Sequence, residues 1–173
     1  MAVALIPLSA DIAFVAASHH AALVAKDTRF EPGLQLLSEV RTGIGTSRDL
    51  KGSLRLQIDG GLALGAVGPS LPADGVVYRG LLTRGVWLSG GIVSSSGLGW
   101  SLGGRVTLAS YEWTTLISLH TELELAAVLA LPITDRLAVH WSLPLFYQFR
   151  RDLQHAFGIA LRAGIRLEIR APR

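Results

Sequence analysis

The chain has 173 residues, half of them hydrophobic, and no cysteine, which excludes disulfides and cysteine metal sites. Positive side chains exceed negative ones by 16 to 13, but only Lys26 and Lys51 are lysines and the arginines are spread along the chain, which excludes a basic nucleic-acid-binding stripe. No run of about 18 apolar residues free of charge occurs, so no transmembrane helix is predicted.

Eight segments along the chain carry apolar residues at every second position, a period that predicts β-strands and excludes amphipathic helices. The first segment is rich in alanine and alternates least clearly. The last alternates over 156–170, with Phe157 and Ile159 on one face and Arg162 and Glu168 on the other, whereas a usual strand has about 5–6 residues. The predicted strands cover approximately 12–25, 34–46, 53–67, 77–93, 98–109, 115–131, 137–150 and 156–170.

Two strands contain a residue that interrupts this pattern. Arg84 lies on the apolar face of the segment 77–93, which a bulge or an early kink toward the interior would explain. Pro144 has no N–H to donate, so the segment 137–150 is expected to bulge or kink. The connections between all segments are short, which predicts an antiparallel up-and-down meander in one domain, residues 1–173.

The apolar faces favour a membrane protein. In the soluble alternative, a lipocalin-like ligand-binding barrel, the outer surface would consist of Gly, Ala, Ser and Arg with almost no Lys. In a transmembrane barrel, eight strands enclose an interior that small side chains fill, and lipid requires an apolar exterior. Each segment is also at least as long as the roughly 9–11 tilted residues that cross a bilayer. We therefore predict an all-β fold, an eight-stranded antiparallel up-and-down transmembrane β-barrel.

This orientation assigns both faces of the strands. Aromatic residues on the apolar parity are expected at the lipid interface: Tyr78, Trp100, Trp141, Tyr147, Phe149 and Phe157. The other parity places ten charges in the lumen: Glu39, Arg41, Arg55, Asp59, Arg105, Glu122, Glu124, Arg162, Arg166 and Glu168. Buried charges must pair, and the hairpin register is expected to bring Glu39 and Arg41 opposite the region from Arg55 to Asp59. These residues predict a charge network that plugs the lumen; the alternative is a narrow ion or solute channel.

In strand number and alternation the chain resembles, over essentially its full length, the bacterial eight-stranded outer-membrane barrels of the OmpA and OmpX type. The last strand is also similar to the barrel-assembly signal of such proteins, with polar Arg162, then Gly164, and hydrophobic Leu167 and Ile169. It departs from that pattern because residues 170–173 follow where an aromatic residue usually ends the chain. The resemblance implies a bacterial outer-membrane location, termini on the periplasmic side, contact with membrane lipid or lipopolysaccharide, and insertion by the outer-membrane assembly machinery.

One pair of residues is a candidate for catalysis. His140 and Ser142 are similar to the His-x-Ser pair of lipid A deacylases, eight-stranded barrels in which this pair and a glutamate form a hydrolytic triad on the outer wall. Here the alternation puts both residues on the lumen side, and the next glutamate is the distant Glu168. A Ser–His pair needs an orienting acid and access for substrate. We therefore expect no enzyme, with a lipid A deacylase-like hydrolase as the alternative.

The remaining histidines and the glycines predict no metal site and no cofactor. His19 and His20 are strand neighbours and point to opposite faces, while His120 and His140 fall on the lumen parity. The glycines follow strand parity and form no phosphate-binding loop between a strand and a helix.

The expected function is that of a small non-catalytic membrane anchor or scaffold, or of a subunit in a larger membrane assembly. Its wall would contact lipid or other membrane proteins, and no nucleic acid is expected as a partner. Residues 1–10 are apolar but too short for a secretion signal and lack its basic start. We therefore expect that Met1 was added to a mature chain and that the signal peptide is not part of this sequence.

Overall fold

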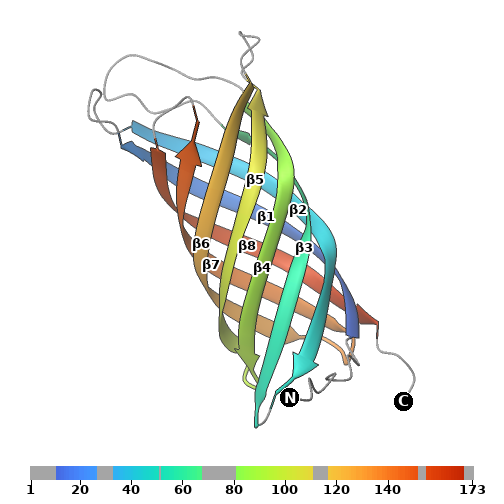
Figure 1. The fold of residues 1–173 in the computed structure, drawn as a ribbon. Helices are drawn as coiled ribbons and strands as arrows, with labels where there is room; N and C mark the ends of the chain where they lie inside the picture. Colours follow the sequence, from blue (N-terminus) through green and yellow to red (C-terminus); the bar gives the residue numbers. More distant parts are fainter. Residues whose placement is uncertain are drawn as a thin grey trace, which may run out of the picture.

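The computed structural model describes residues 11–26, 33–50, 52–67, 81–110, 117–151 and 155–169. These segments form eight strands, and each pairs antiparallel with the next. Strand β8 also pairs with β1, from Ile12 opposite Ile169 to Lys26 opposite His155, so the sheet closes into a barrel without a free edge (Figure 1). The strands are β1 (Asp11–Lys26), β2 (Gly33–Asp49), β3 (Leu54–Val67), β4 (Leu81–Ser94), β5 (Leu98–Ser110), β6 (Ile117–Pro132), β7 (Leu137–Arg150) and β8 (His155–Ile169). No helix long and apolar enough to span a membrane occurs in these segments.

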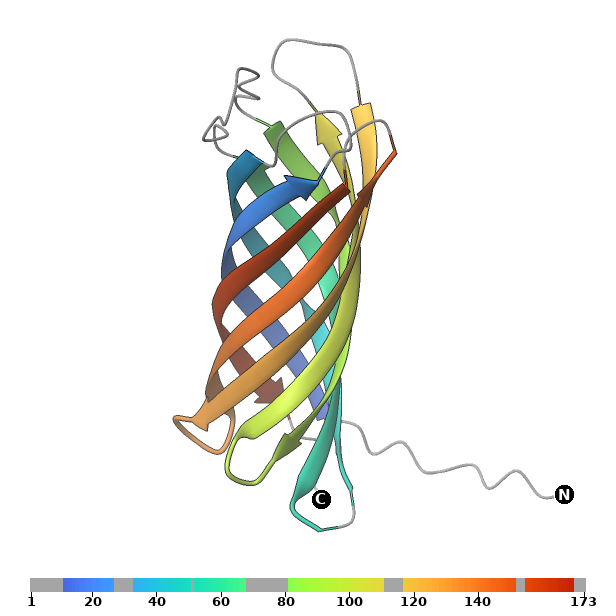
Figure 2. The ribbon, with the colours of Figure 1, turned by 90° about the vertical axis from the view of Figure 1, so that its left-hand side faces the viewer.

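The two ends of the barrel differ in their connections. At one end, called here the turn end, β1 begins, β8 ends, and tight connections join β2 to β3, β4 to β5 and β6 to β7 (Figure 2). The opposite end is called the loop end. In the turn from β4 to β5, Gly97 has a φ of 85°, and a Cβ added to it would lie 2.0 Å from the carbonyl oxygen of Ala130. This turn therefore requires glycine both for its backbone conformation and for its close approach to β6.

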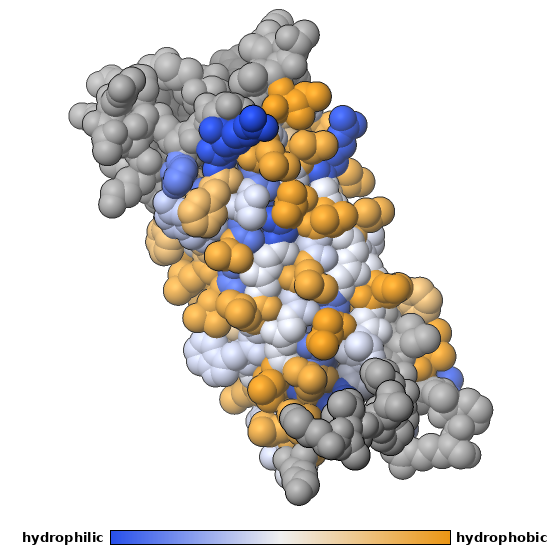
Figure 3. Space-filling view, viewed as in Figure 1, coloured by the Kyte–Doolittle hydropathy of each residue, from blue (hydrophilic) through white to orange (hydrophobic). Residues whose placement is uncertain are grey.

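Side chains alternate between an apolar outer wall and a polar interior, as β6 illustrates. Glu122 is 1% exposed and Glu124 2%, whereas the intervening Leu123 is 58% exposed. A cluster of buried apolar side chains in the interior lies toward the loop end and consists of Leu37, Ala109, Phe146, Ala156 and Ala160. Figure 3 shows hydrophobic residues spread along the height of the wall on the side in view. The structure is the predicted transmembrane barrel, with its apolar face turned outward.

Arg84 lies in a regular strand, so the expected bulge or inward kink is wrong. Arg84 pairs with Leu64 of β3 on one side and with Leu108 of β5 on the other, and both registers are unbroken. Its side chain is exposed on the outer wall, three residues from the loop-end start of β4. A long arginine side chain near a strand end can extend out of the hydrocarbon to the headgroups.

Pro144 produces a gap in one ladder instead of the expected bulge. Its pairing with Ala126 of β6 is in register, but the pairs to β8 stop at Ser142–Arg162 and resume at Leu145–Ile159. The register is the same on both sides of the gap, so no extra residue is inserted. The proline lacks the N–H that this ladder would use, and the pairs on either side hold β7 in place.

The expected register between β2 and β3 is also wrong. Glu39 lies opposite Gly65 and Arg41 opposite Ala63, while Arg55 lies opposite Asp49. The reason is that β2 continues to Asp49, beyond its predicted end at residue 46, so the turn falls later in the chain and shifts every pair. Gly45, opposite Asp59, has room for no side chain, since an added Cβ would meet the Asp59 carboxylate.

Candidate functional site: the lumen

The structure places all ten predicted lumen charges on the inward face, where they form two groups along the barrel. The first, called the central cluster, consists of Glu39, Arg41, Arg105, Glu122, Glu124 and Arg162. The second, called the turn-end cluster, consists of Arg55, Asp59, Arg166 and Glu168 together with Asp49, which is not among the ten. Both bring together strands that are far apart in the sequence.

Arg41 is the hub of the central cluster. Its Nε donates to Glu39 at 2.7 Å, its Nη1 lies 3.1 Å from Glu124, and its Nη2 lies 3.7 Å from Glu122. The guanidinium also lies 5.9 Å from the ring centroid of Trp87. Because a guanidinium presents five N–H donors in a fixed plane, one arginine can join carboxylates from β2 and β6 across the lumen.

Two further arginines complete this cluster. Arg105 of β5 donates to Glu39 and, at 2.7 Å, to Glu122. Arg162 of β8 donates to Glu124 at 2.6 Å. The three arginines and three glutamates balance in charge, and the paired carboxylates and guanidiniums come from four strands, so the cluster crosses the lumen.

Polar contacts continue from the central cluster toward the loop end. Gln148 of β7 donates to Glu122 at 3.2 Å and accepts from Arg150 at 2.6 Å. Trp87 is buried on the other side of the lumen, and its indole N–H donates to the carbonyl of Leu62 at 3.1 Å. The ten predicted lumen charges do not include Gln148, Arg150, Trp87 or Phe146, although the alternation places these four on the same inward face.

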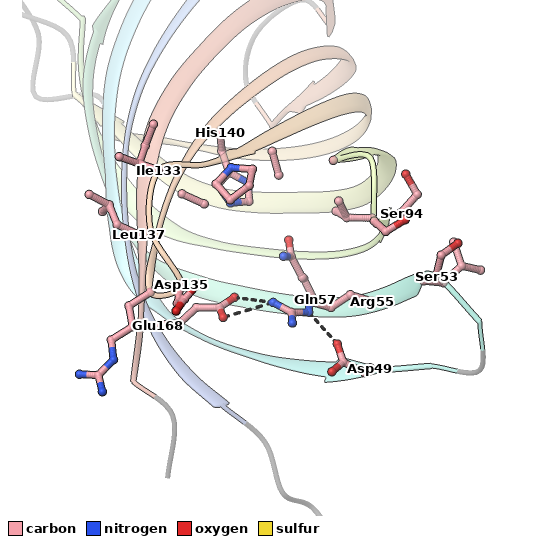
Figure 4. Close-up of a pocket in the computed structure, with 18 of the residues that line it drawn as sticks. Asp49, Ser53, Arg55, Gln57, Ser94, Ile133, Asp135, Leu137, His140 and Glu168 are labelled. Carbon is pink, nitrogen blue, oxygen red and sulfur yellow. Dashed lines mark hydrogen bonds and ion pairs between the residues drawn. The ribbon is translucent and has the colours of Figure 1, made fainter. Parts of the chain in front are cut away.

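The turn-end cluster lies at the mouth of the barrel. Arg55 is held between Asp49, at 2.8 Å, and Glu168, at 3.2 Å, as Figure 4 shows. Arg166 contacts Asp59 and lies 3.4 Å from Glu168. Asp49 was not predicted as a site residue because it falls in the segment expected to be a turn.

This cluster borders an open cavity of about 670 Å³, called here the vestibule. Its lining comes from the three turns and from the adjoining ends of β2, β3, β4, β6, β7 and β8. Gln57 and His140 extend into it (Figure 4). The lumen is thus open from the turn end as far as the level of His140, and the buried central cluster lies beyond it.

The His140–Ser142 pair lacks the arrangement of a hydrolytic site. Both side chains face the lumen, the Nε2 atom of His140 has no hydrogen bond, and Ser142 lies opposite Arg162 in the ladder. The next glutamate along the chain, Glu168, is engaged by Arg55. Among the described side chains, no group of three or more His, Asp or Glu is placed to hold a metal ion. His120 is buried in the lumen, and Tyr78 and the side chains of His19 and His20 lie outside the described residues.

On the outer wall, aromatic side chains gather toward the two ends. Trp100 and Trp141 lie near the turn-end starts of β5 and β7, and Tyr147, Phe149 and Phe157 lie near the loop end. Tyr147 is hydrogen-bonded to His155 at 2.8 Å, and its ring contacts that of Phe149 edge-on. Among the described side chains of the wall, Arg48 and Arg84 carry the only full charges, each near a strand end. Aromatic girdles around an uncharged band are typical of barrels that span a lipid bilayer.

The predicted assembly-signal positions divide between the two faces of β8. Arg162 and Gly164 face the lumen, whereas Leu167 and Ile169 are exposed on the wall. Residues 170–173, where the chain departs from the usual ending, lie outside the described part of the chain.

Comparison with known proteins identifies solved structures with the same fold. Neisserial surface protein A superposes with a TM-score of 0.55 at 15% identity, over 91% of this chain and 97% of that chain. Ail, the attachment invasion locus protein of Yersinia pestis, gives a TM-score of 0.47 at 12% identity, over 91% of this chain and 99% of that chain. No protein-family model and no curated protein matches the chain. At such identity the likeness to Neisserial surface protein A establishes the fold, an eight-stranded barrel of the outer-membrane type, which the sequence resemblance had predicted.

Proposed function

We propose that the protein resides in a bacterial outer membrane as a non-catalytic anchor or scaffold, or as a subunit of a membrane assembly, with a lumen plugged by its charge network. The observation that carries the proposal is the burial of the central cluster: Arg41, Arg105 and Glu122 are each 1–3% exposed. Opening a pore through the barrel would require these paired groups to separate inside a narrow, poorly hydrated space. Removing one partner from such a pair costs about 3–5 kcal/mol.

The outer wall supports the membrane part of this proposal over the soluble alternative. Leu88, Leu102 and Trp100 are each 64–66% exposed, and in water such a continuous apolar surface would drive aggregation. In a bilayer the same wall is matched to lipid, and the closed ladder leaves no backbone edge unpaired.

A non-catalytic role is supported by the absence of a triad around His140 and Ser142 in the described lumen. The pair faces inward, and a lipid substrate would reach only the outer wall. The contacts available to the protein are therefore those of its wall with lipid or lipopolysaccharide and with neighbouring membrane proteins, and those of its two ends.

Planar lipid bilayers distinguish the plugged barrel from the alternative of a narrow channel. We expect purified protein, reconstituted at low protein density, to produce no single-channel current steps, because the central cluster occupies the lumen. A bacterial porin inserted in the same bilayers serves as the positive control. Reproducible steps that scale with the amount of protein would overturn the plugged lumen and favour the channel.

A further inference from the structure

A second cavity lies deeper in the lumen than the vestibule. It has a volume of about 80 Å³ and is called here the inner cavity. Gln57, Val93 and His140 line both the vestibule and the inner cavity, so they form the neck between them. The inner cavity ends at the central cluster, where Arg41 and Arg162 contribute to its lining.

The lining of the inner cavity carries more positive than negative charge. Arg41, Arg162 and Arg166 line it, against one carboxylate, that of Asp59, which already contacts Arg166. Glu124, which pairs with both Arg41 and Arg162, does not line the cavity. Arg41 also pairs with Glu39 and Glu122, and these two carboxylates likewise do not line the cavity.

The inner cavity is also lined by residues with buried polar atoms that have no hydrogen bond. Arg166 is 1% exposed, and its Nη2 atom has no hydrogen-bond partner. The Nη2 atom of Arg41 and the Nε2 atom of His140 are likewise buried without a hydrogen bond. Ser89, Ser101 and Ser142 add hydroxyl groups to the same lining, and a hydroxyl can donate to an anion.

We propose that the inner cavity binds a small monovalent anion, a halide in particular, which enters from the turn end through the vestibule. Guanidinium donors form their strongest hydrogen bonds with anions, and the low dielectric of a narrow lumen strengthens the attraction. The volume, about 80 Å³, admits a halide with a few waters but excludes a lipid. The bound anion would accept from Arg166 and the serine hydroxyls, and would complete the hydrogen bonding at the base of the plug.

Crystallography with bromide tests the site directly. Crystals of the wild-type barrel are transferred to sodium bromide, and anomalous differences are measured at the bromine absorption edge. We expect a peak in the inner cavity beside Arg166 and the serine hydroxyls. Water alone in the inner cavity, in crystals that bind bromide elsewhere on the protein, would overturn the proposal.

A solution measurement separates anion binding from a general salt effect. In detergent, sodium bromide should raise the thermal unfolding midpoint in a saturable way, relative to sodium gluconate at equal ionic strength, because gluconate is too large for the cavity. Arg166→Gln should abolish this difference, whereas Arg151→Gln, which alters an exposed arginine directly after β7 at the loop end, should preserve it. If Arg166→Gln does not fold, Ser142→Val narrows the cavity without removing a charge and should also abolish the difference. A bromide effect that persists in the folded variants would contradict the proposal.

Discussion

At the scale of single residues, Arg41 shows how this interior is stabilised. Its guanidinium contacts carboxylates of Glu39, Glu122 and Glu124 and is almost fully buried. A charge in such a place is tolerated because its partners are held in position by neighbouring strands. The same arrangement makes each member costly to remove, because the remaining carboxylates would be buried without compensation.

Arg41→Gln should therefore lower the free energy of unfolding by about 3–5 kcal/mol. The measurement is urea-induced unfolding in lipid vesicles, followed by tryptophan fluorescence. The matched control is Arg136→Gln in an exposed turn, which should change stability by no more than about 0.5 kcal/mol. Equal effects of the two substitutions would show that the central cluster contributes no more than a surface charge.

At the scale of the strands, the alternation of β6 assigns each side chain to one of two environments. Leu119, Leu123 and Leu125 face outward, while Glu122 and Glu124 between them face the central cluster. Arg84 of β4 shows that the outer face accepts a charge near a strand end. The cost of a charge on the wall should therefore depend on its depth in the bilayer.

Leu123→Arg, near the middle of β6, should destabilise the barrel in vesicles by about 2–4 kcal/mol. Leu82→Arg, two residues from Arg84 and near the loop end, should cost about 0–1 kcal/mol. Leu123 is 58% exposed and Leu82 is 52% exposed, so the two substitutions remove similar packing contacts. A difference between their costs in stability therefore reports the depth of each position in the bilayer. Equal costs at the two positions would argue against a bilayer around this wall.

At the scale of the whole molecule, the barrel combines a closed ladder, an apolar wall and tight turns at one end. The tight turns at the turn end offer little surface for recognition, and within the part of the chain that the structure describes the wall is the largest surface for contact. This favours association with other membrane proteins, as a subunit or anchor.

Extraction from native membranes in mild detergent should therefore yield a complex larger than the monomer on a native gel. Harsher, ionic detergent should release the single chain, which controls for aggregation. Recovery of the monomer alone in mild detergent would count against a role in an assembly and leave an isolated lipid-embedded barrel.

The sequence by itself determined the number of strands, their antiparallel order and the face that meets lipid. These properties follow from alternation with a period of two, which is local to each segment. The alternation assigns the same residues to each face even when a predicted strand end is wrong by a few residues. The inward parity of Glu39, Arg105 or Arg166 could therefore be predicted residue by residue. The sequence does not predict a role in the lumen for Trp87 and Phe146, because an uncharged aromatic side chain on the inward face does not require a partner.

Only the tertiary structure decided which lumen groups meet. Arg41 and Glu124 are 83 residues apart and Arg55 and Glu168 are 113 apart, and their contact depends on closure of the barrel and on the stagger of all its strands. The turn after Asp49 shows the reason, because its displacement by a few residues changes every pair between β2 and β3. Likewise, the register alone revealed that Arg84 needs no bulge and that β7 tolerates Pro144 through a gap in the ladder. Alternation is encoded within a strand, whereas register and closure are properties of all eight strands together.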